Sequence, residues 1–336
     1  MGRLVGPIAR KAPLFGNGMT KRTWSKIAVM GAGAVGCYFG GMLARAGANV
    51  TLIGRPRHVD PINRDGLCFQ SLDFQAYIPV AATVDVAAVR EAQLVLFCVK
   101  SLDTEDAALK MAPYLAPDAV ILSLQNGVDN VGRIRSHLKN EVICGLVYAA
   151  AQMPAPGCVT HTGGRDVIIG KTRESRGDDE SDQRVLGEIA RLLVGAGFRV
   201  KVSDDIEADL WTKLVMNCAY NAVCALSGAP YGVMVAMPEI RGVMRAVVEE
   251  VSRVAQARGV RLPDTMIETV FKLADAMPQT MSSTAQDIRN GKRTEIDHLN
   301  GYVVREGEAL GIPTPVNRTL NALMKLLEQT ELGPSG

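Results

Sequence analysis

The stretch from Lys26 to Gly36, "KIAVMGAGAVG", decides which fold the first half of the chain adopts. A short apolar run leads into three glycines with G-x-G-x-x-G spacing, and the helical pattern "AVGCYFGGMLARAG" follows. Such glycines permit a tight turn, close approach of the backbone to a pyrophosphate and close helix–strand packing. The phosphates then lie at the positive end of the helix. The alternative is a plain strand–helix turn with chance glycines. The residues predicted to bind a dinucleotide here are Gly31, Gly33, Ala34, Val35 and Gly36.

Strand and helix patterns alternate outward from this stretch. A second strand is expected at "NVTLIG" (49–54), and the alternation predicts a doubly wound, largely parallel sheet of Rossmann type. Two strand-like runs flank Gly163-Gly164, which predicts a hairpin turn there. The remaining expected elements are strands at 94–99, 119–124 and 142–150, helices at 103–115, 128–138 and 184–196, and a charged loop at 172–183.

Helical patterns replace strand patterns after Ser203, which predicts an all-α second domain. We therefore expect a Rossmann domain over 25–202 and a helical domain over 203–331. The first 24 residues are basic and rich in Gly and Pro, and they lack the apolar segment of a secretory signal, so we expect a disordered extension. The expected helices are 205–226, 238–258, 263–276, 283–290, 294–310 and 315–331.

The composition is that of a soluble globular protein. Apolar residues make up 47% and charged residues 21% of the 336, and the net charge is +2, so the polyelectrolyte character of a nucleic-acid-binding protein is missing. No apolar run is long enough to predict a membrane span. The seven cysteines are odd in number and form no CxxC pair, which predicts reduced thiols and a cytoplasmic protein.

The end of the second strand indicates which dinucleotide binds. An acidic residue there would bind the ribose 2′-hydroxyl of NAD, but the sequence reads "NVTLIGRPRH", without an acid and with Arg55 and Arg57. A guanidinium suits a 2′-phosphate, so NADP (as NADPH) is favoured, with Arg55 nearer the strand end. The alternative is that both arginines are ordinary surface residues.

Polar residues follow two further strands, where ligands bind in open α/β sheets. "LVLFCVKS" brings Lys100 to such a strand end, and "AVILSLQNGVDN" brings Gln125, Asn126 and Gly127. We expect Lys100 to approach the cofactor or an anionic substrate, and Asn126 to anchor cofactor and substrate through its amide. The alternatives are an exposed loop lysine and an ordinary Asn-Gly turn.

The helical stretch "LWTKLVMNCAYNAVCALSG" (210–228) is apolar on nearly every side except at Lys213, Asn217 and Asn221. At ~100° per residue these three lie within about 80° of one another on one face. Burying them without partners costs several kcal/mol. One interpretation is a satisfied network between domains. The other is a substrate wall, in which Lys213 protonates a carbonyl oxygen as hydride reaches its carbon and the asparagines orient the substrate.

A second candidate wall is "MSSTAQDIRNGKRTEIDHLNG". Ser283 and Gln286 fit a capping box, so Ser283 is a substrate ligand or a helix N-cap, and Ser282 offers a neighbouring hydroxyl. Glu295 is expected in the first turn of the next helix, where an acid is favoured, and the charge of Lys213 gives a further reason for a nearby carboxylate. The four histidines lack ligand-like spacing, so no metal site is predicted.

Together these motifs resemble the ketopantoate reductase (2-dehydropantoate 2-reductase) family, from about Ser25 to about Leu327. The segments on which the resemblance rests are "IAVMGAGAVG", "VKSLDT", "LQNGV", "LWTKLVMNCAYNAVCAL" and "SSTAQDIRNGKRTEIDHLNGYVV". The resemblance implies an NADP-binding Rossmann domain joined to an all-α domain like that of 6-phosphogluconate dehydrogenase, with catalysis in the cleft. It also implies reduction of a branched 2-oxo acid with a 4-hydroxyl to its 2-hydroxy acid, a step toward pantothenate.

The resemblance also implies roles for residues of the helical domain. The catalytic lysine of the family matches Lys213, and its substrate-binding asparagines match Asn217 and Asn221. The serine that receives the substrate carboxylate matches Ser283. The glutamate that contributes near the substrate and nicotinamide matches Glu295.

In the Rossmann domain, the resemblance assigns Asn126 to the nicotinamide end, Lys100 to a cofactor contact and Arg55 to the 2′-phosphate. One departure concerns the substrate. A Pro-Asn-Gly turn often carries another substrate-facing asparagine in this family, whereas here "GAPYGVM" places Tyr231 there. The tyrosine either supplies a hydroxyl or fills the pocket and changes which 2-oxo acid fits.

Three functions follow in order of expectation. The first is an NADPH-dependent reductase of ketopantoate, and the second is a dehydrogenase of a different 2-oxo or hydroxy acid or of a phosphorylated substrate. The third is a protein that senses NADP without chemistry of its own. The third leaves the polar stripe of the helix unexplained. A homodimer is a possible assembly, and neither nucleic acid nor membrane is an expected partner.

Overall fold

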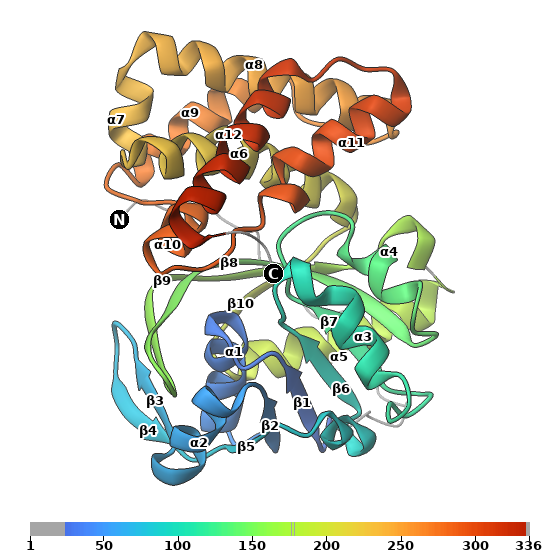
Figure 1. Cartoon of the computed structure of the whole chain (residues 1–336). Helices are drawn as coiled ribbons and strands as arrows, with labels where there is room; N and C mark the ends of the chain where they lie inside the picture. Colours follow the sequence, from blue (N-terminus) through green and yellow to red (C-terminus); the bar gives the residue numbers. More distant parts are fainter. Residues whose placement is uncertain (1–23, 176, 178, 334–336) are drawn as a thin grey trace. The chain divides into compact units, whose positions relative to one another are not determined.

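The computed structural model describes residues 24–175, 177 and 179–333, so the predicted N-terminal extension, apart from Trp24, lies outside the described residues. The chain forms two compact units, and the boundary between them falls between Leu210 and Trp211 (Figure 1). Within the described residues, no helix combines the length and the apolar character needed to cross a membrane. Each unit is built around its own set of elements.

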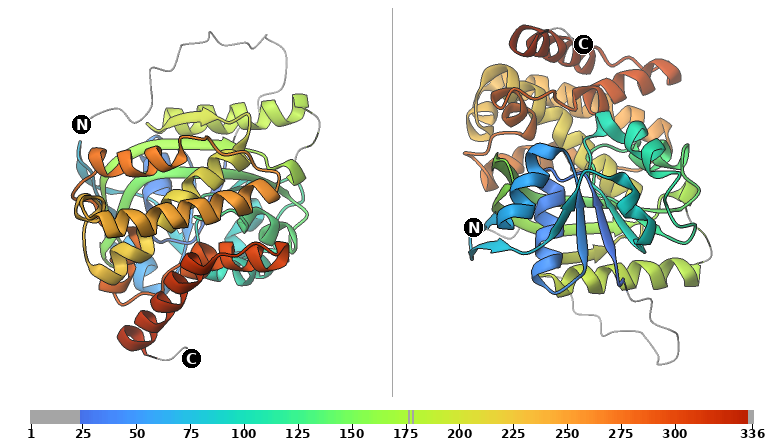
Figure 2. Two further views of the ribbon diagram at one scale, coloured as in Figure 1. Left: turned by 90° about the horizontal axis from the view of Figure 1, so that it is seen from above. Right: turned by 60° about the horizontal axis from the view of Figure 1, so that its bottom comes forward.

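The first unit is built on one 10-stranded sheet with the order β4-β3-β9-β8-β7-β6-β1-β2-β5, and β10 pairs with β9. The central strands, from β8 to β5 in this order, are parallel, whereas β8–β9 and β3–β4 are antiparallel. The strands fan out in the right view of Figure 2. Their bounds are β1 Ile27–Met30, β2 Val50–Ile53, β3 Leu67–Gln70, β4 Gln75–Ile78, β5 Ala81–Thr83, β6 Leu94–Phe97, β7 Val120–Ser123, β8 Glu141–Ala155, β9 Cys158–Gly170 and β10 Arg199–Val202.

Helices cover both faces of this sheet. Successive side chains of a strand point to opposite faces, so each strand contributes to two cores. Ile27 and Val29 of β1 belong to the core that includes α1 (Ala34–Arg45) and α5 (Asp179–Gly195). Ala28 and Met30 point to the opposite core, with α3 (Thr104–Met111), α4 (Asn130–Arg135) and the 3₁₀ turn η1 (Val86–Glu91). The doubly wound α/β prediction is therefore confirmed. The unit also contains α2 (Pro56–Asp65), η2 (Ser101–Asp103) and η3 (Arg173–Ser175).

The strand order reverses at β1, which pairs with β2 on one side and with β6 on the other. Such a switch point separates the loops at the carboxyl ends of adjacent strands and leaves room for a ligand between them. Here those loops are the glycine turn after β1, the arginine segment after β2 and the Lys100 segment after β6.

The hairpin predicted at Gly163-Gly164 is wrong. β9 runs without interruption through both glycines, and the turn lies earlier, between Ala155 of β8 and Cys158. The β8–β9 pairing shifts register opposite these glycines, and Gly164 has a φ of +74°. A Cβ on Gly164 would lie 2.1 Å from the carbonyl oxygen of Tyr148. The two glycines therefore belong to a β-bulge within the strand. Because bulges and tight turns both favour glycine, the composition alone does not distinguish them. The predicted 172–183 loop is also shorter, because α5 begins at Asp179.

The cysteine prediction is wrong for one pair. Cys68 of β3 and Cys158 of β9 are directly opposite each other in the parallel pairing, with 4.4 Å between their Cα atoms, and they form a disulfide. The pairing joins residues 90 positions apart in sequence, so spacing alone does not reveal it. The remaining cysteines are free thiols, and burial raises the pKa of Cys37 to about 12.

In the described part of the second unit, all regular elements are helices, as the sequence predicts. A single helix was expected over 294–310, but Leu299 has φ −114° and ψ −102°, which separates η4 (Ile296–His298) from α11. The short helix α7 was not expected. The helices are α6 Ile206–Ser227, which begins in the first unit, α7 Tyr231–Ala236, α8 Pro238–Ala257, α9 Met266–Ala276, α10 Ser283–Arg289, α11 Asn300–Leu310 and α12 Pro315–Leu332.

A buried polar chain links four helices of this unit. Glu250 of α8 accepts hydrogen bonds from the backbone N–H groups of Val316 and Asn317, both at 2.9 Å, and so caps the start of α12. The Asn317 side chain accepts from Asn300 at 2.9 Å, and Asn300 also donates to the carbonyl of Cys218 in α6 at 3.2 Å. Glu250 is only 3% exposed. Through the carbonyl of Cys218, these bonds hold the backbone of α6 in position next to Asn217.

Candidate active site

The turn after β1 has the geometry that the glycine spacing predicts. Gly31 has a φ of +108°, and the N–H groups of Gly31 and Ala32 both donate to the carbonyl of Ile53, at 3.0 and 2.9 Å. A Cβ on Gly31 would lie 2.7 Å from the Val99 backbone nitrogen, and a Cβ on Gly36 would lie 2.0 Å from the Gly31 carbonyl oxygen. These two glycines are therefore required by the packing of the chain itself.

Gly33 differs from the other two glycines, because a Cβ built on it meets no atom of the described chain within 4 Å. It is the N-cap of α1, with φ −90° and ψ −164°, a conformation open to other residues. The first N–H groups of α1, which include those of Ala34 and Val35, have no carbonyl one turn earlier to bond. The open space beside Gly33 and these donors suit a pyrophosphate, so the turn fits a dinucleotide.

Arg55 follows β2 by two residues and occupies the N-cap position of α2, with Pro56 as the first helical residue. Its side chain is 77% exposed, and its Nη2 lies 3.6 Å from a carboxylate oxygen of Asp103. Gly54 stands between the strand and Arg55, and a Cβ there would lie 2.5 Å from Ala32 Cβ. Position 54, which lies against the glycine turn, therefore has no room for a longer side chain, including an acidic one.

Lys100 and Asn126 lie after the neighbouring parallel strands β6 and β7, and both are half-buried. The loops that carry them are joined, because the Ser101 hydroxyl donates to the Asn126 carbonyl at 2.9 Å. Gln125 donates from Nε2 to the Val99 carbonyl at 3.0 Å. The structure thus brings the predicted cofactor residues of the first unit to the carboxyl ends of adjacent strands.

Lys213 and Asn217 of the polar stripe lie on the less buried side of α6. From Trp211 to Cys224, the positions that keep partial exposure are Thr212, Lys213, Met216 and Asn217, while the others are buried. Asn221 is 2% exposed, and within the described residues its Nδ2 has no hydrogen-bond partner. A buried amide donor without a partner costs roughly 1–3 kcal/mol. A donor kept at this cost beside Lys213 and Asn217 is suited to bind a ligand oxygen.

The segment before α10 corrects the predicted capping box. Ser282, not Ser283, is the N-cap, and its hydroxyl accepts from the Ala285 N–H at 3.1 Å. The same hydroxyl lies 3.4 Å from the Asn221 carbonyl, to which it donates, and Ser282 is 1% exposed. Ser283 is the first helical residue and is exposed. Its hydroxyl is therefore not used for capping, and Ser282 ties this segment to the polar stripe of α6.

The sequence predicts Glu295 in the first turn of an α-helix. In the structure it lies instead at the N-cap position of the 3₁₀ turn η4. It is half-buried. Thr294 next to it is held by a hydrogen bond from its N–H to Glu328 at 2.7 Å. Among the described residues, no group of three or more His, Cys, Asp or Glu lies together in a way that suits a metal ion.

Tyr231, the departure from the family pattern, is the first residue of α7 and is 9% exposed. Its ring packs on Tyr220 of α6, with centroids 4.2 Å apart, and its N–H donates to the Thr280 carbonyl at 3.1 Å. Burial raises the pKa of its phenol, so the group stays protonated at neutral pH. The tyrosine adds apolar volume against Tyr220 of α6, the residue next to Asn221 in the sequence.

Two family models cover most of the chain. The model for ketopantoate reductase PanE/ApbA matches residues 27–174, and the model for its C-terminal part matches 205–328. The chain belongs to the ketopantoate reductase family. A 2-dehydropantoate 2-reductase of Halobacterium salinarum is 33% identical over 308 residues, which is 90% of this chain and 99% of the relative. The corresponding enzyme of Archaeoglobus fulgidus is also 33% identical, over 306 residues, 90% of this chain and 98% of the relative.

Solved structures agree with this family assignment. The crystal structure of a PanE/ApbA family ketopantoate reductase from Ralstonia eutropha is 48% identical, with a TM-score of 0.84 over 91% of this chain and 99% of that one. A D-mandelate dehydrogenase in complex with NADH and anilino(oxo)acetate is 25% identical, with a TM-score of 0.83 over 91% of this chain and 99% of its own. The same architecture thus occurs, among solved structures, both in a ketopantoate reductase and in a D-mandelate dehydrogenase.

Proposed function

We propose that this member of the ketopantoate reductase family reduces ketopantoate to pantoate with NADPH, a step toward pantothenate. The observation that carries the proposal is the face of α6, which presents Lys213 and Asn217 on its less buried side. This face ends at Asn221, whose Nδ2 has no hydrogen-bond partner among the described residues. The names of the curated relatives support the substrate, and the glycine turn supports a dinucleotide.

In the proposed reaction, the chain supplies binding groups and one proton. The bound NADPH supplies a hydride to the carbonyl carbon of the 2-oxo acid. Lys213 donates a proton to the carbonyl oxygen, so that the product is a 2-hydroxy acid. Asn217 and Asn221 hold the substrate oxygens by their amides, and Ser283 receives the carboxylate. Glu295 provides a carboxylate that balances the ammonium charge of Lys213.

The residues of the first unit hold the cofactor in this proposal. The N–H groups at the start of α1 bind the pyrophosphate beside Gly33. Lys100 contacts the cofactor, and Asn126 orients its nicotinamide end and the substrate. Arg55, together with the positive end of α2, binds the 2′-phosphate.

The substrate is tested by following NADPH oxidation with a panel of 2-oxo acids. We expect ketopantoate to give the highest kcat/KM, and 2-oxo acids without the 4-hydroxyl to give lower values because the amides of α6 then lose a partner. A higher kcat/KM for an apolar acid such as phenylglyoxylate would favour the second candidate, a reductase of a different 2-oxo acid. The buried Tyr231 and the likeness to D-mandelate dehydrogenase favour that candidate. If NADPH binds but no acid is reduced, the protein senses NADP without catalysis.

The cofactor choice is tested at Arg55. Replacing Arg55 by alanine is expected to raise the KM for NADPH about tenfold, since an exposed charge-assisted contact contributes roughly 1–1.5 kcal/mol. The KM for NADH is expected to stay unchanged, because NADH lacks the 2′-phosphate. The matched control is Arg64→Ala, which removes an equally exposed arginine paired with Asp65 at the other end of α2. Equal changes in both KM values would show that Arg55 does not read the 2′-phosphate.

A further inference from the structure

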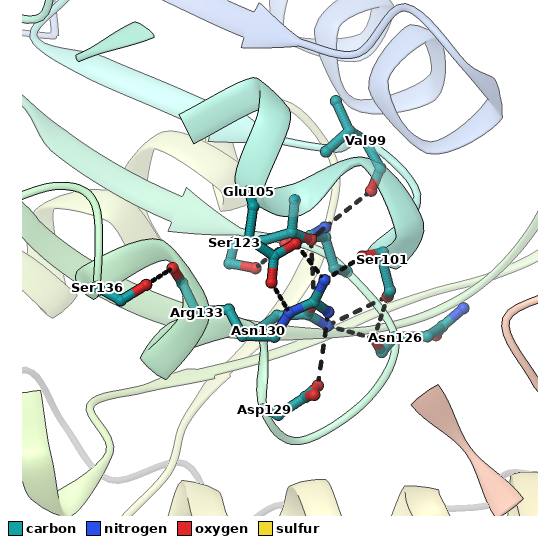
Figure 3. Close-up of polar contacts among 11 residues, drawn as sticks. Val99, Ser101, Glu105, Ser123, Asn126, Asp129, Asn130, Arg133 and Ser136 are labelled. Carbon is teal, nitrogen blue, oxygen red and sulfur yellow. Dashed lines mark hydrogen bonds and ion pairs between the residues drawn. The ribbon is translucent and has the colours of Figure 1, made fainter. Parts of the chain in front are cut away.

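We infer that Arg133 is a positioning residue that sets the two loops carrying Lys100 and Asn126, an inference that rests on the proposed NADPH site. Arg133 lies on α4, and its side chain is 17% exposed. Figure 3 shows its guanidinium at the centre of a polar network between these loops. Neither the glycine turn nor the polar stripe of α6 includes this residue.

The guanidinium makes contacts in three directions. Its Nη2 donates to the Ser101 carbonyl at 2.7 Å, immediately after Lys100. Its Nε and Nη2 donate to the two carboxylate oxygens of Glu105, each at 2.6 Å, in a forked pair. In the third direction, Nη1 donates to Asn130 Oδ1 at 3.1 Å and lies 3.9 Å from Asp129 Oδ1. Only the planar fork of an arginine supplies donors along all of these directions at once.

Asn130 extends this network to the second loop. Its Nδ2 donates to the Asn126 carbonyl and also to the Ser101 hydroxyl, the latter at 3.3 Å. Its Oδ1 accepts from the Thr104 hydroxyl at 3.2 Å as well as from Arg133. Asn130 is 3% exposed, and both Ser101 and Thr104 are fully buried, so the bonds are shielded from competing water.

The network holds the backbone at two points, the carbonyls of Ser101 and Asn126, which lie beyond the hydrogen bonds of the sheet. The β6–β7 pairing ends at Phe97 and Ser123, so the following loops lie beyond the regular ladder. Arg133 and Asn130 bind the carbonyls of Ser101 and Asn126 in these loops. In Figure 3 the Asn126 side chain points away from Arg133. The network therefore orients the loop backbone and leaves the Asn126 amide directed elsewhere, as a cofactor ligand requires.

The test measures NADPH binding by fluorescence or calorimetry with the full-length protein, because binding does not depend on the identity of the 2-oxo acid. Arg133→Gln is expected to raise the Kd for NADPH about 10-fold or more, since charge-assisted hydrogen bonds are lost. Arg133→Lys is expected to fall between the wild type and Arg133→Gln, because one ammonium group replaces part of the fork. The matched control, Arg135→Gln, removes an exposed arginine from the same helix and should leave the Kd unchanged.

A second measurement separates positioning from a general loss of stability. Hydrogen exchange of the apo protein should accelerate at 99–103 and 124–128 in Arg133→Lys while exchange in α1 stays as in the wild type. Should Arg133→Gln fail to fold, Arg133→Lys and Ser101→Ala carry the same test. An unchanged NADPH Kd in these variants, with only a lower Tm, would overturn the inference. A wild type that does not bind NADPH would instead overturn the cofactor proposal, and the inference with it.

Discussion

Replacing Lys213 by alanine is expected to lower kcat about 10²–10⁴-fold, the usual contribution of a positioned proton donor. The KM for NADPH is expected to change little, because Lys213 lies on α6 and the proposed cofactor ligands lie on the loops of the first unit. The measurement is steady-state NADPH oxidation at saturating ketopantoate with the NADPH concentration varied, which gives both kcat and the KM for NADPH. A loss confined to kcat identifies an interaction made in the transition state.

Two controls make the Lys213 result specific. Thr212→Ala changes the adjacent position, which has the same partial exposure, and should leave kcat within a factor of about two since it removes no proton donor. Small primary amines added to the Lys213→Ala protein should restore part of kcat, because they supply the missing acid. Turnover near the wild-type value in Lys213→Ala would show that the proton comes from another group.

The second large effect concerns the glycine turn, where two substitutions are expected to fail for different reasons. Gly36→Ala places a Cβ 2.0 Å from the Gly31 carbonyl oxygen, so α1 has to move away from β1. We expect a free energy of unfolding lower by ~1–3 kcal/mol or more, together with loss of NADPH binding. Gly33→Ala meets no atom of the chain within 4 Å, so its stability should match the wild type.

The Gly33→Ala protein should still bind NADPH at least about tenfold more weakly, because its methyl group enters the space proposed for the pyrophosphate. Chemical denaturation and NADPH titration of the same samples measure both quantities. Gly242→Ala in the exposed interior of α8 is the control, where an added Cβ also meets nothing within 4 Å. Wild-type NADPH affinity in Gly33→Ala would place the phosphates away from this turn.

Local sequence was sufficient for the features that depend on short-range order. The apolar run and glycine spacing at 26–36 specify a strand, a turn and a helix within a few residues, and the structure contains all three. The same holds for Lys213 and Asn217 of α6, which recur with the helical period and fall on its less buried side, whereas Asn221 is buried. The local structure of these two segments is therefore what short-range order in the sequence predicts correctly.

Features that depend on distant partners were not predictable. Gly163-Gly164 has the composition of a turn, and only the pairing with Tyr148 and Ala150 shows that it forms a bulge. The contact between Cys68 and Cys158 depends on the alignment of β3 with β9. Arg133 was missed because its importance comes from the Ser101 carbonyl, 32 residues away in the chain. The choice of Ser282 over Ser283 as N-cap needed the backbone conformation, since both are serines.

The course of α6 affects any attempt to express the helical unit of the protein separately. Ile206 and Leu210 in its first turns belong to the core of the first unit, and Asp205 before it accepts a hydrogen bond from the Ala208 N–H. A fragment cut at the boundary after Leu210 would leave Lys213 in the terminal turn of a newly made helix end, where helices fray. A fragment that began earlier would expose the apolar side chains of Ile206 and Leu210 to water. Lys213 is therefore best studied in the intact polypeptide.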